Sequence, residues 1–349
     1  MTGLHSVSGR GWVEPGADYR PPRAWRNPHV LTIWAAKASR RPQVAWQRER
    51  WTTPDGDFVD VDTSEAKVTS DAPLLVLLHG LEGGSSSHYA QAMAQATQDR
   101  GWLCVVPHFR GCSGEINQAP RAYHSGDHAE VDWMLAQVAE RHPGRRRIAV
   151  GVSLGGNALM VWAGQQGDAA RRRVEAVCAV CSPLDLMASG QALEQGLCRW
   201  IYTPMFLRTM KAKARDKWAQ YPGLFDLDRA MKSSTLRAFD DVFTAPLHGF
   251  DGVAHYWTTA SAKPWLHHVA LPALVLNAED DPFVPVASLP DASQVSSHVQ
   301  LWRPSSGGHV GFPMWNAKSG WRGSVSWMPE AVCDWMASTV GLPVQMSHG

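Results

Sequence analysis

The feature that most constrains this chain is a short turn between an apolar strand and a helix. Residues 151–155 read GVSLG; an apolar run at 147–150 precedes them, and 156–162 are typical of the start of a helix. A serine between such glycines must sit on a sharp, strained bend, where the glycines leave room for the bend and for close strand–helix packing. The pattern therefore predicts that Ser153 presents its hydroxyl at the end of a strand, as a candidate nucleophile.

A serine hydroxyl is a weak nucleophile at neutral pH, so the chain should also supply a base and an acid that orients it. Downstream, an apolar strand at 272–277 runs into a turn that contains Asp280, Asp281 and Pro282. We predict Asp281 as the acid, because a carboxylate directly before proline is typical of this strand exit. Asp280 and a solvated acidic turn without a catalytic role are the alternatives.

The base is predicted in a glycine-rich loop after the last strand. That strand, at 298–302, leads into residues 305–312, which contain His309. A surface-loop histidine taken alone carries little information. The order Ser153, Asp281, His309, each after a suitable strand, favours His309 as the general base.

An oxyanion formed during acyl transfer needs backbone N–H donors aimed at it. We expect one donor from Leu154, the residue after the nucleophile, and the other from Leu81 in the loop after an apolar strand at 74–78. In the same loop, His79 is expected to hold the backbone by hydrogen bonding, and Glu82 to lie at the mouth of the site without acting in catalysis.

Strands and helices alternate along the chain, which predicts an α/β fold with a mostly parallel central sheet and helices on both faces. The predicted strands are 74–78, 103–106, 148–152, 176–181, 272–277 and 298–302, and the predicted helices are 88–99, 127–141, 155–165 and 329–339. We expect residues 1–45 to be an arm packed on the core, 46–185 and 263–349 to form the two parts of that core, and 186–262 to be an inserted helical lid.

The middle of the expected lid, 197–217, has a helical pattern with an apolar face. Met205 and Phe206 are the candidate substrate-binding residues on that face. The alternative interpretation is that the same face packs on the core and touches no substrate.

Several further segments resemble the YheT-like branch of the α/β-hydrolase superfamily, which includes bacterial esterases and eukaryotic membrane-anchored lipid hydrolases. The segments that carry the resemblance are 26–34 (RNPHVLTIW), 54–62, 79–83 (HGLEG), 109–117 (FRGCSGEIN), 123–126 (YHSG), 239–250, 280–283 and 307–312. The resemblance runs from about Asn27 to the last helix, and the triad pattern of the branch falls on Ser153, Asp281 and His309 without a gap.

This resemblance implies an α/β-hydrolase fold with a helical lid, and hydrolysis of carboxylic esters with an apolar acyl chain through an acyl-enzyme intermediate. Some relatives transfer the acyl group to an alcohol, so an acyltransferase or a thioesterase with the same triad is the alternative. A second alternative is a binding protein with the hydrolase fold and a catalytically inactive site. No cofactor and no metal are expected.

The composition of the 349 residues excludes little else. Lysine plus arginine number 33 and aspartate plus glutamate 32, a net charge of +1 that gives no overall electrostatic case for nucleic acid or an anionic membrane. We expect no membrane-spanning segment, no N-terminal anchor and no signal peptide, and hence a cytoplasmic protein with a small-molecule ester or lipid-ester substrate. The six cysteines are expected to be free thiols, and the oligomeric state stays open.

Overall fold

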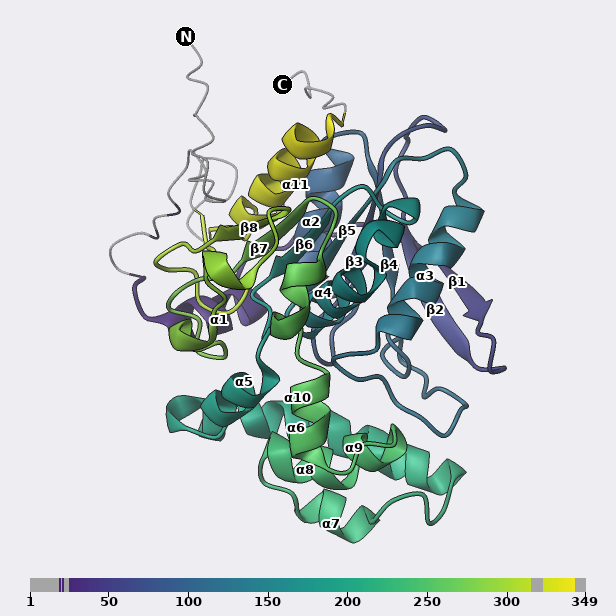
Figure 1. Ribbon diagram of the computed structural model, residues 1–349, viewed down its shortest axis with the longest axis vertical. Coiled ribbons are helices and arrows are strands. Elements are labelled where there is room, and N and C mark those ends of the chain that lie inside the picture. The colour runs from purple at the N-terminus through teal and green to yellow at the C-terminus, as the bar shows by residue number, and fades with distance from the viewer. Residues whose placement is uncertain (1–18, 20, 22–24, 315–322, 343–349) are drawn as a thin grey trace.

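The computed structural model describes residues 19, 21, 25–314 and 323–342, which build an eight-stranded sheet with helices on both faces (Figure 1). The strand order is β1-β2-β4-β3-β5-β6-β7-β8; β1 and β2 are antiparallel to their neighbours and the other six strands run parallel. The strands are β1 Trp46–Thr52, β2 Phe58–Ser64, β3 Leu74–Leu78, β4 Leu103–Pro107, β5 Arg147–Val152, β6 Val177–Val180, β7 Ala273–Leu276 and β8 Val299–Trp302.

The two faces of the sheet are covered by different helices, as an all-apolar parallel strand requires. Helices α2 (His88–Gln98) and α11 (Trp327–Val340) pack on one face, and α3 (His128–Arg141) and α4 (Leu154–Gln166) pack on the other. Successive residues of β3 alternate between these layers, because side chains of a strand point to opposite faces in turn. Leu75 and Leu77 join the cluster that contains α2 and α11, whereas Leu74, Val76 and Leu78 join the cluster that contains α3 and α4.

The predicted α/β fold class is therefore confirmed, and the ends of the ten predicted elements lie within two residues of the observed ones. The sequence did not predict β1 and β2. These strands carry charges on neighbouring positions, where Arg48 lies opposite Asp62 and Arg50 opposite Asp60, with Nε–Oδ1 distances of 2.7 Å in both pairs. Such cross-strand ion pairs stabilise a sheet. Their charged residues, however, do not produce the apolar pattern by which strands are recognised in a sequence.

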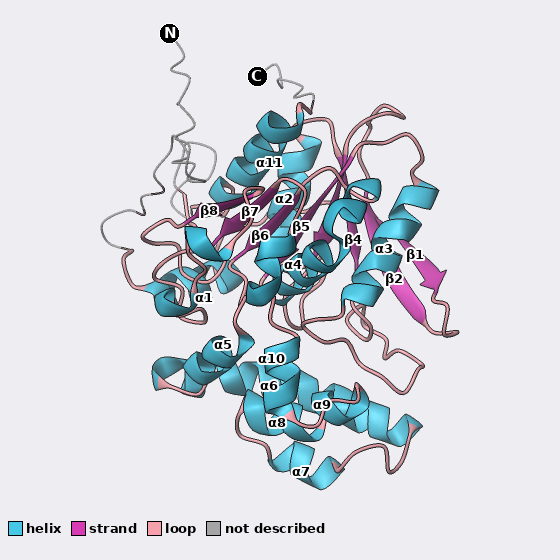
Figure 2. Cartoon of the chain, in the orientation of Figure 1, coloured by secondary structure: helices cyan, strands magenta, loops and turns pink. Residues whose placement is uncertain are grey.

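Residues between β6 and β7 form a helical segment that lies beside one end of the sheet (Figure 2). We use the name helical segment for residues 186–262, which contain α5 Leu186–Leu193, α6 Gly196–Gln220, α7 Leu227–Lys232, α8 Leu236–Val242, α9 Thr244–Leu247 and α10 Val253–Thr259. It has its own core of buried aromatic and aliphatic side chains, among them Tyr202, Phe239 and Trp257. Short 3-10 helices lie in the connections between elements: η1 Gly167–Arg172 after α4, η2 Lys263–His268 before β7, and η3 Val286–Ser288 and η4 Ala292–Gln294 between β7 and β8.

Most of the first 24 residues of the expected arm lie outside the described part of the chain. The rest of it contains helix α1 (Pro28–Lys37), which begins where the Asn27 side chain accepts the backbone N–H groups of His29 and Val30. The proline at the first helical position suits that start, since its missing N–H would have no partner there. Trp34 and Ala35 of α1 pack with Ala92 of α2 and so attach the helix to the sheet layers. In the described ranges, no helix combines the length and the apolar character needed to cross a membrane.

Candidate active site

The serine turn has the strained backbone that its sequence predicts. Strand β5 ends at Val152, helix α4 begins at Leu154, and Ser153 between them has φ 53° and ψ −121°. A positive φ is costly for a residue with a side chain, so tight packing around the turn must hold it. A Cβ atom at Gly155 would overlap the carbonyl oxygens of Leu78 and His79, which shows why this position accepts only glycine.

His309 lies within hydrogen-bond distance of both other residues of the predicted triad. His309 Nε2 is 3.0 Å from Ser153 Oγ, and His309 Nδ1 is 2.8 Å from Asp281 Oδ2. The Asp281 side chain is fully buried, and His309 is 11% exposed. Because an ionised carboxylate can only accept, it favours the tautomer with the proton on Nδ1, which leaves the Nε2 lone pair facing the serine hydroxyl.

Asp280, the alternative acid, is directed away from the histidine ring. Its carboxylate accepts the backbone N–H of Gly308 at 2.9 Å and the hydroxyl of Ser306 at 2.7 Å. Asp281 also accepts the N–H of Phe283 at 2.8 Å, which fixes its carboxylate under the ring. The two neighbouring carboxylates thus have different partners: Asp280 shapes the loop, and Asp281 contacts the imidazole.

The His309 loop is also held from the N-terminal side of the chain. Thr32 Oγ1 accepts the backbone N–H of His309 at 2.9 Å and donates to the carbonyl of Pro28 at 2.7 Å. Gly308, at φ +59°, lies so close to α1 that an added Cβ would be 2.7 Å from the Pro28 oxygen. Sequence reasoning missed Thr32, because no local pattern connects a threonine in one helix to a loop near the other end of the chain.

The two predicted oxyanion donors belong to residues that lie close to the serine. Leu154 is the first residue of α4, where backbone N–H groups have no partner inside the helix and the helix dipole favours negative charge. Gly80 approaches the serine so closely that an added Cβ would be 3.1 Å from Ser153 Cβ, and Leu81 follows it in the chain. Both leucines line the cavity that contains Ser153.

His79 holds this loop, as the sequence predicts. Its Nε2 accepts the backbone N–H of Phe109 at 3.0 Å, so the proton is on Nδ1, which contacts the Gly80 carbonyl at 2.8 Å. Burial lowers the pKa of His79 to about 3, and the ring is therefore neutral at pH 7. A neutral, doubly bonded histidine fixes backbone and is unsuited to moving protons.

Glu82 lies at the mouth of the site in a left-handed conformation, with φ 57°. Its Oε1 accepts the hydroxyl of Tyr123 at 2.7 Å and the ammonium of Lys213, on α6, also at 2.7 Å. Tyr123 in turn accepts the backbone N–H of Glu82 at 3.0 Å. These bonds connect the loop that contains Leu81 to the helical segment.

A cavity between the sheet edge and the helical segment contains Ser153 and His309 in its wall and encloses about 140 Å³ of solvent-accessible space. Phe206 and Met210 of α6 line it, together with side chains from α5, α8 and α10. Met205 does not: it is 38% exposed and lies outside this wall. Consecutive helical residues point about 100° apart, so the predicted pair Met205 and Phe206 cannot both face the cavity, and Met210 takes the second place.

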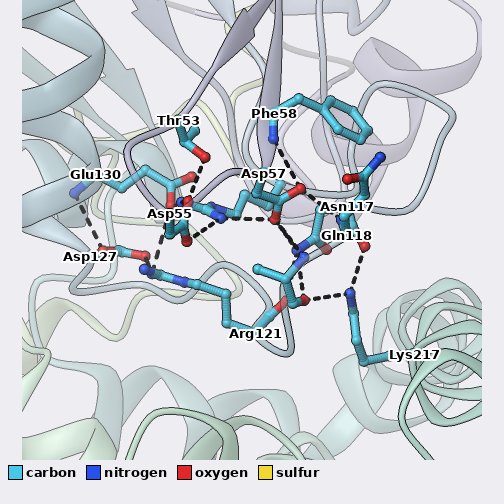
Figure 3. A network of polar contacts seen from close by, with 12 residues as sticks. Thr53, Asp55, Asp57, Phe58, Asn117, Gln118, Arg121, Asp127, Glu130 and Lys217 are labelled. Carbon is cyan, nitrogen blue, oxygen red and sulfur yellow. Dashed lines mark hydrogen bonds and ion pairs between the residues drawn. The ribbon is translucent and has the colours of Figure 1, made fainter.

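The opposite end of the cavity wall is polar and is braced by the network of Figure 3. Arg110 is 5% exposed and contacts three carboxylates at 2.8 Å, those of Asp55, Asp57 and Glu130. Burial opposes ionisation of Asp57, but donors that include the Asn117 side chain nevertheless lower its pKa to about 2. The segment 109–117, which supports the family resemblance, is therefore held beside the cavity by the contacts of Arg110 and Asn117 with these carboxylates.

Lys217 of α6 completes this polar end. Its ammonium donates to the backbone carbonyls of Asn117 and Ala119, at 2.7 and 2.8 Å, and so connects the helical segment to the loop (Figure 3). Within the described ranges, no group of three or more histidine, cysteine, aspartate or glutamate side chains is arranged to hold a metal ion. All six cysteines are free thiols, as expected.

Comparisons with known proteins identify the family and the fold. Residues 73–313 match the family model described as alpha/beta hydrolase fold. The chain is 38% identical to "Putative esterase YheT" of Escherichia coli (strain K12), covering 85% of this chain and 87% of that protein. It is 31% identical to phospholipase ABHD3 of Homo sapiens, over 78% and 68% of the two chains. Among solved structures, 2,6-dihydroxy-pseudo-oxynicotine hydrolase superposes with a TM-score of 0.53 at 16% identity, over 87% of this chain and 71% of that one.

Proposed function

The chain belongs to the alpha/beta hydrolase fold family, in its YheT-like branch, and is an ester hydrolase; from that premise we propose that Ser153, His309 and Asp281 form its catalytic triad. The substrate is a carboxylic ester with an apolar acyl chain, cleaved through an acyl-enzyme intermediate. One observation carries this proposal: the continuous hydrogen-bond chain from Asp281 through His309 to a serine on a strained turn.

In the first step, Ser153 Oγ attacks the ester carbonyl while His309 Nε2 takes the hydroxyl proton across the 3.0 Å contact. Asp281 keeps the imidazole in the tautomer that can accept this proton and stabilises the imidazolium that forms. His309 then donates the proton to the leaving alkoxide, and the alcohol departs. The acyl group remains on Ser153 as an ester.

The tetrahedral intermediate carries negative charge on the former carbonyl oxygen. The backbone N–H groups of Leu81 and Leu154 are the proposed donors to it, and the first turn of α4 adds its dipole. Fixed donors of this kind contribute about 3–4 kcal/mol each to stabilising such a transition state. In the second step a water molecule, deprotonated by His309, repeats the attack and releases the acid.

The apolar wall of the cavity supports the proposed acyl specificity. Phe206 and Met210 line the same cavity as Ser153. Phe283, whose ring contacts that of His309 at a tilt with centroids 4.2 Å apart, lines it near the triad. Each methylene buried there stabilises the complex by about 0.8 kcal/mol. The helical segment thus acts as a lid over the triad, as proposed from its position in the chain.

The test combines active-site labelling with a substrate series. A fluorophosphonate probe should label the protein at Ser153; Ser153→Ala should abolish labelling, and Ser306→Ala, which changes a nearby hydroxyl on the histidine loop, should retain it. The kcat/KM for p-nitrophenyl esters should rise from acetate to medium chains. Labelling that persists in Ser153→Ala would falsify the nucleophile. A product assay with added alcohol distinguishes hydrolysis from acyl transfer.

A further inference from the structure

The exposed large apolar side chains are not scattered over the surface. In the part of the chain that the structure describes, they come from α1, from the first half of α6 and from Val286. Single exposed apolar residues are normal, but several together mark an interaction surface. We call the six on the two helices the α1–α6 patch: Val30, Ile33, Leu197, Trp200, Ile201 and Met205.

The four α6 members form one stripe along the helix. Leu197, Ile201 and Met205 are spaced by four residues, and Trp200 lies beside them, so all four share a face. Trp200 is 73% exposed, the highest value among these side chains. The opposite side of α6 carries Phe206 and Met210, which line the cavity. The helix is therefore apolar toward the cavity and also toward solvent.

The α1 members adjoin this stripe. The ring of His29 stacks on that of Tyr202 with centroids 5.8 Å apart, and His29 Nδ1 is 3.3 Å from the tyrosine hydroxyl. Val30 and Ile33 lie one and four positions from His29, and Ile201 precedes Tyr202 in the chain. The two helices thus meet at the His29–Tyr202 contact, with exposed apolar side chains beside it on both.

The two stretches of chain that carry the patch contain charges of one sign. From residue 25 to 41, and from 196 to 215, the sequence contains no aspartate or glutamate. Arg26, Lys37, Arg199 and Arg208 are exposed in these ranges, and the Arg199 guanidinium lies 5.5 Å from the ring of Trp200. A tryptophan-bearing apolar stripe with arginines beside it suits the boundary between acyl chains and anionic headgroups.

We propose that the α1–α6 patch is a docking surface for an anionic phospholipid membrane, on which the protein binds peripherally. The apolar side chains enter the boundary region of the bilayer, and the arginines contact anionic headgroups. The net charge of +1 does not oppose this, because a membrane senses only the charges within a Debye length, about 8 Å at physiological salt. Docking is independent of the proposed function, since binding requires no turnover.

Co-sedimentation with vesicles tests the proposal on the full chain. The protein should pellet with phosphatidylcholine vesicles containing 30% phosphatidylglycerol, and far less with pure phosphatidylcholine. Leu197→Ser combined with Trp200→Ser should weaken binding at least fivefold, and Arg208→Glu severalfold. Arg172→Glu, at another exposed arginine, on η1, is the matched control and should bind as the wild type does.

Hydrolysis of a water-soluble acetate ester, measured on the same samples, checks that each variant is folded and should stay within twofold of wild type. Three results would overturn the proposal: no pelleting of the wild type, unchanged pelleting of the serine double variant, or equal binding to neutral and anionic vesicles. A fourth is a wild-type dimer that the double variant converts to a monomer, because the patch would then bind a second copy of the chain.

Discussion

The sheet and the helical segment contribute to the site in different ways. The proposed reacting groups, Ser153, Asp281 and His309, lie in the turn or loops that follow β5, β7 and β8, where backbone geometry fixes their positions. The helical segment supplies most of the apolar side chains of the cavity wall and no member of the proposed triad. The proposed chemistry and the proposed selectivity therefore rest largely on separate parts of the chain, and we expect substitutions in one to leave the other largely unchanged.

The largest effect should come from the acid on the sheet side. Asp281→Asn should lower kcat by 10³–10⁴-fold, because the amide can favour the wrong histidine tautomer. Asp280→Asn should cost less than about tenfold, since an amide oxygen can still accept the bonds from Gly308 and Ser306. Steady-state kinetics on one ester checks both. If Asp280→Asn has the larger effect, the acid is assigned one residue too late.

Thr32 extends the sheet-side machinery to α1, as a positioning residue. Thr32→Val keeps the shape but leaves the part-buried N–H of His309 without its acceptor, which costs about 1 kcal/mol. We expect kcat to fall about tenfold with KM nearly unchanged, and Thr32→Ser to restore it. Ser39→Ala removes a similar bond within the α1 region, from Ser39 Oγ to the Ala35 carbonyl, and is the control. Equal losses in kcat for Thr32→Val and Ser39→Ala would reduce Thr32 to a purely structural role.

The two faces of α6 should separate selectivity from turnover. Phe206→Ser should flatten the rise of kcat/KM with acyl length, which we expect to be several-fold per two carbons in the wild type, while acetate esters are still cleaved. Met205→Ser, one residue away on the exposed face, should leave the profile unchanged. A flat wild-type profile, or equal effects of both variants, would show that the cavity wall does not select the acyl chain.

The smallest effects concern stability and pH, and they should have opposite signs in the two regions. Burial holds the pKa of His79, beside the sheet, at about 3. Between pH 6.5 and about 3 this histidine therefore binds a proton only in the unfolded protein, so the wild type loses stability as the pH falls. Burial raises the pKa of Asp240, in α8, to about 6, so stability is lost as the pH rises from 4 to 6.

Differences between variant and wild type isolate these two groups from all others. Relative to wild type, His79→Gln should gain stability from pH 7 down to pH 4.5, at about 1 kcal/mol per pH unit, and Asp240→Asn should gain in the opposite direction. Urea unfolding at pH 4.5 and 7.5 measures both. Parallel trends in the two variants would mean that the regions share one electrostatic response.

The sheet was more predictable than the helical segment for a physical reason. Buried parallel strands are continuous apolar runs, and the serine turn is a local pattern, so both are visible in short windows of sequence. Helix α6 is apolar on two faces, so periodicity could identify the helix without showing which face lines the cavity. This ambiguity placed Met205 beside Phe206 in the predicted binding surface.

The contacts missed in the site join residues that are far apart in the chain. Thr32 contacts His309 across 277 positions, and Lys213 contacts Glu82 across 131. Neither residue type is unusual in a helix, so a single sequence carries no signal for either bond. The triad was accessible because its members occur in a fixed order after strands, whereas these supporting bonds depend on tertiary packing alone.

The Arg110 network also restricts how this sequence can diverge. Removing the arginine alone leaves the buried carboxylates of Asp57 and Glu130 without their shared cation, at a cost of about 3–5 kcal/mol. A large part of the stability of a typical domain is lost at that single step. The three positions should therefore change as a set or stay fixed in related chains, so substitutions at them are expected to covary.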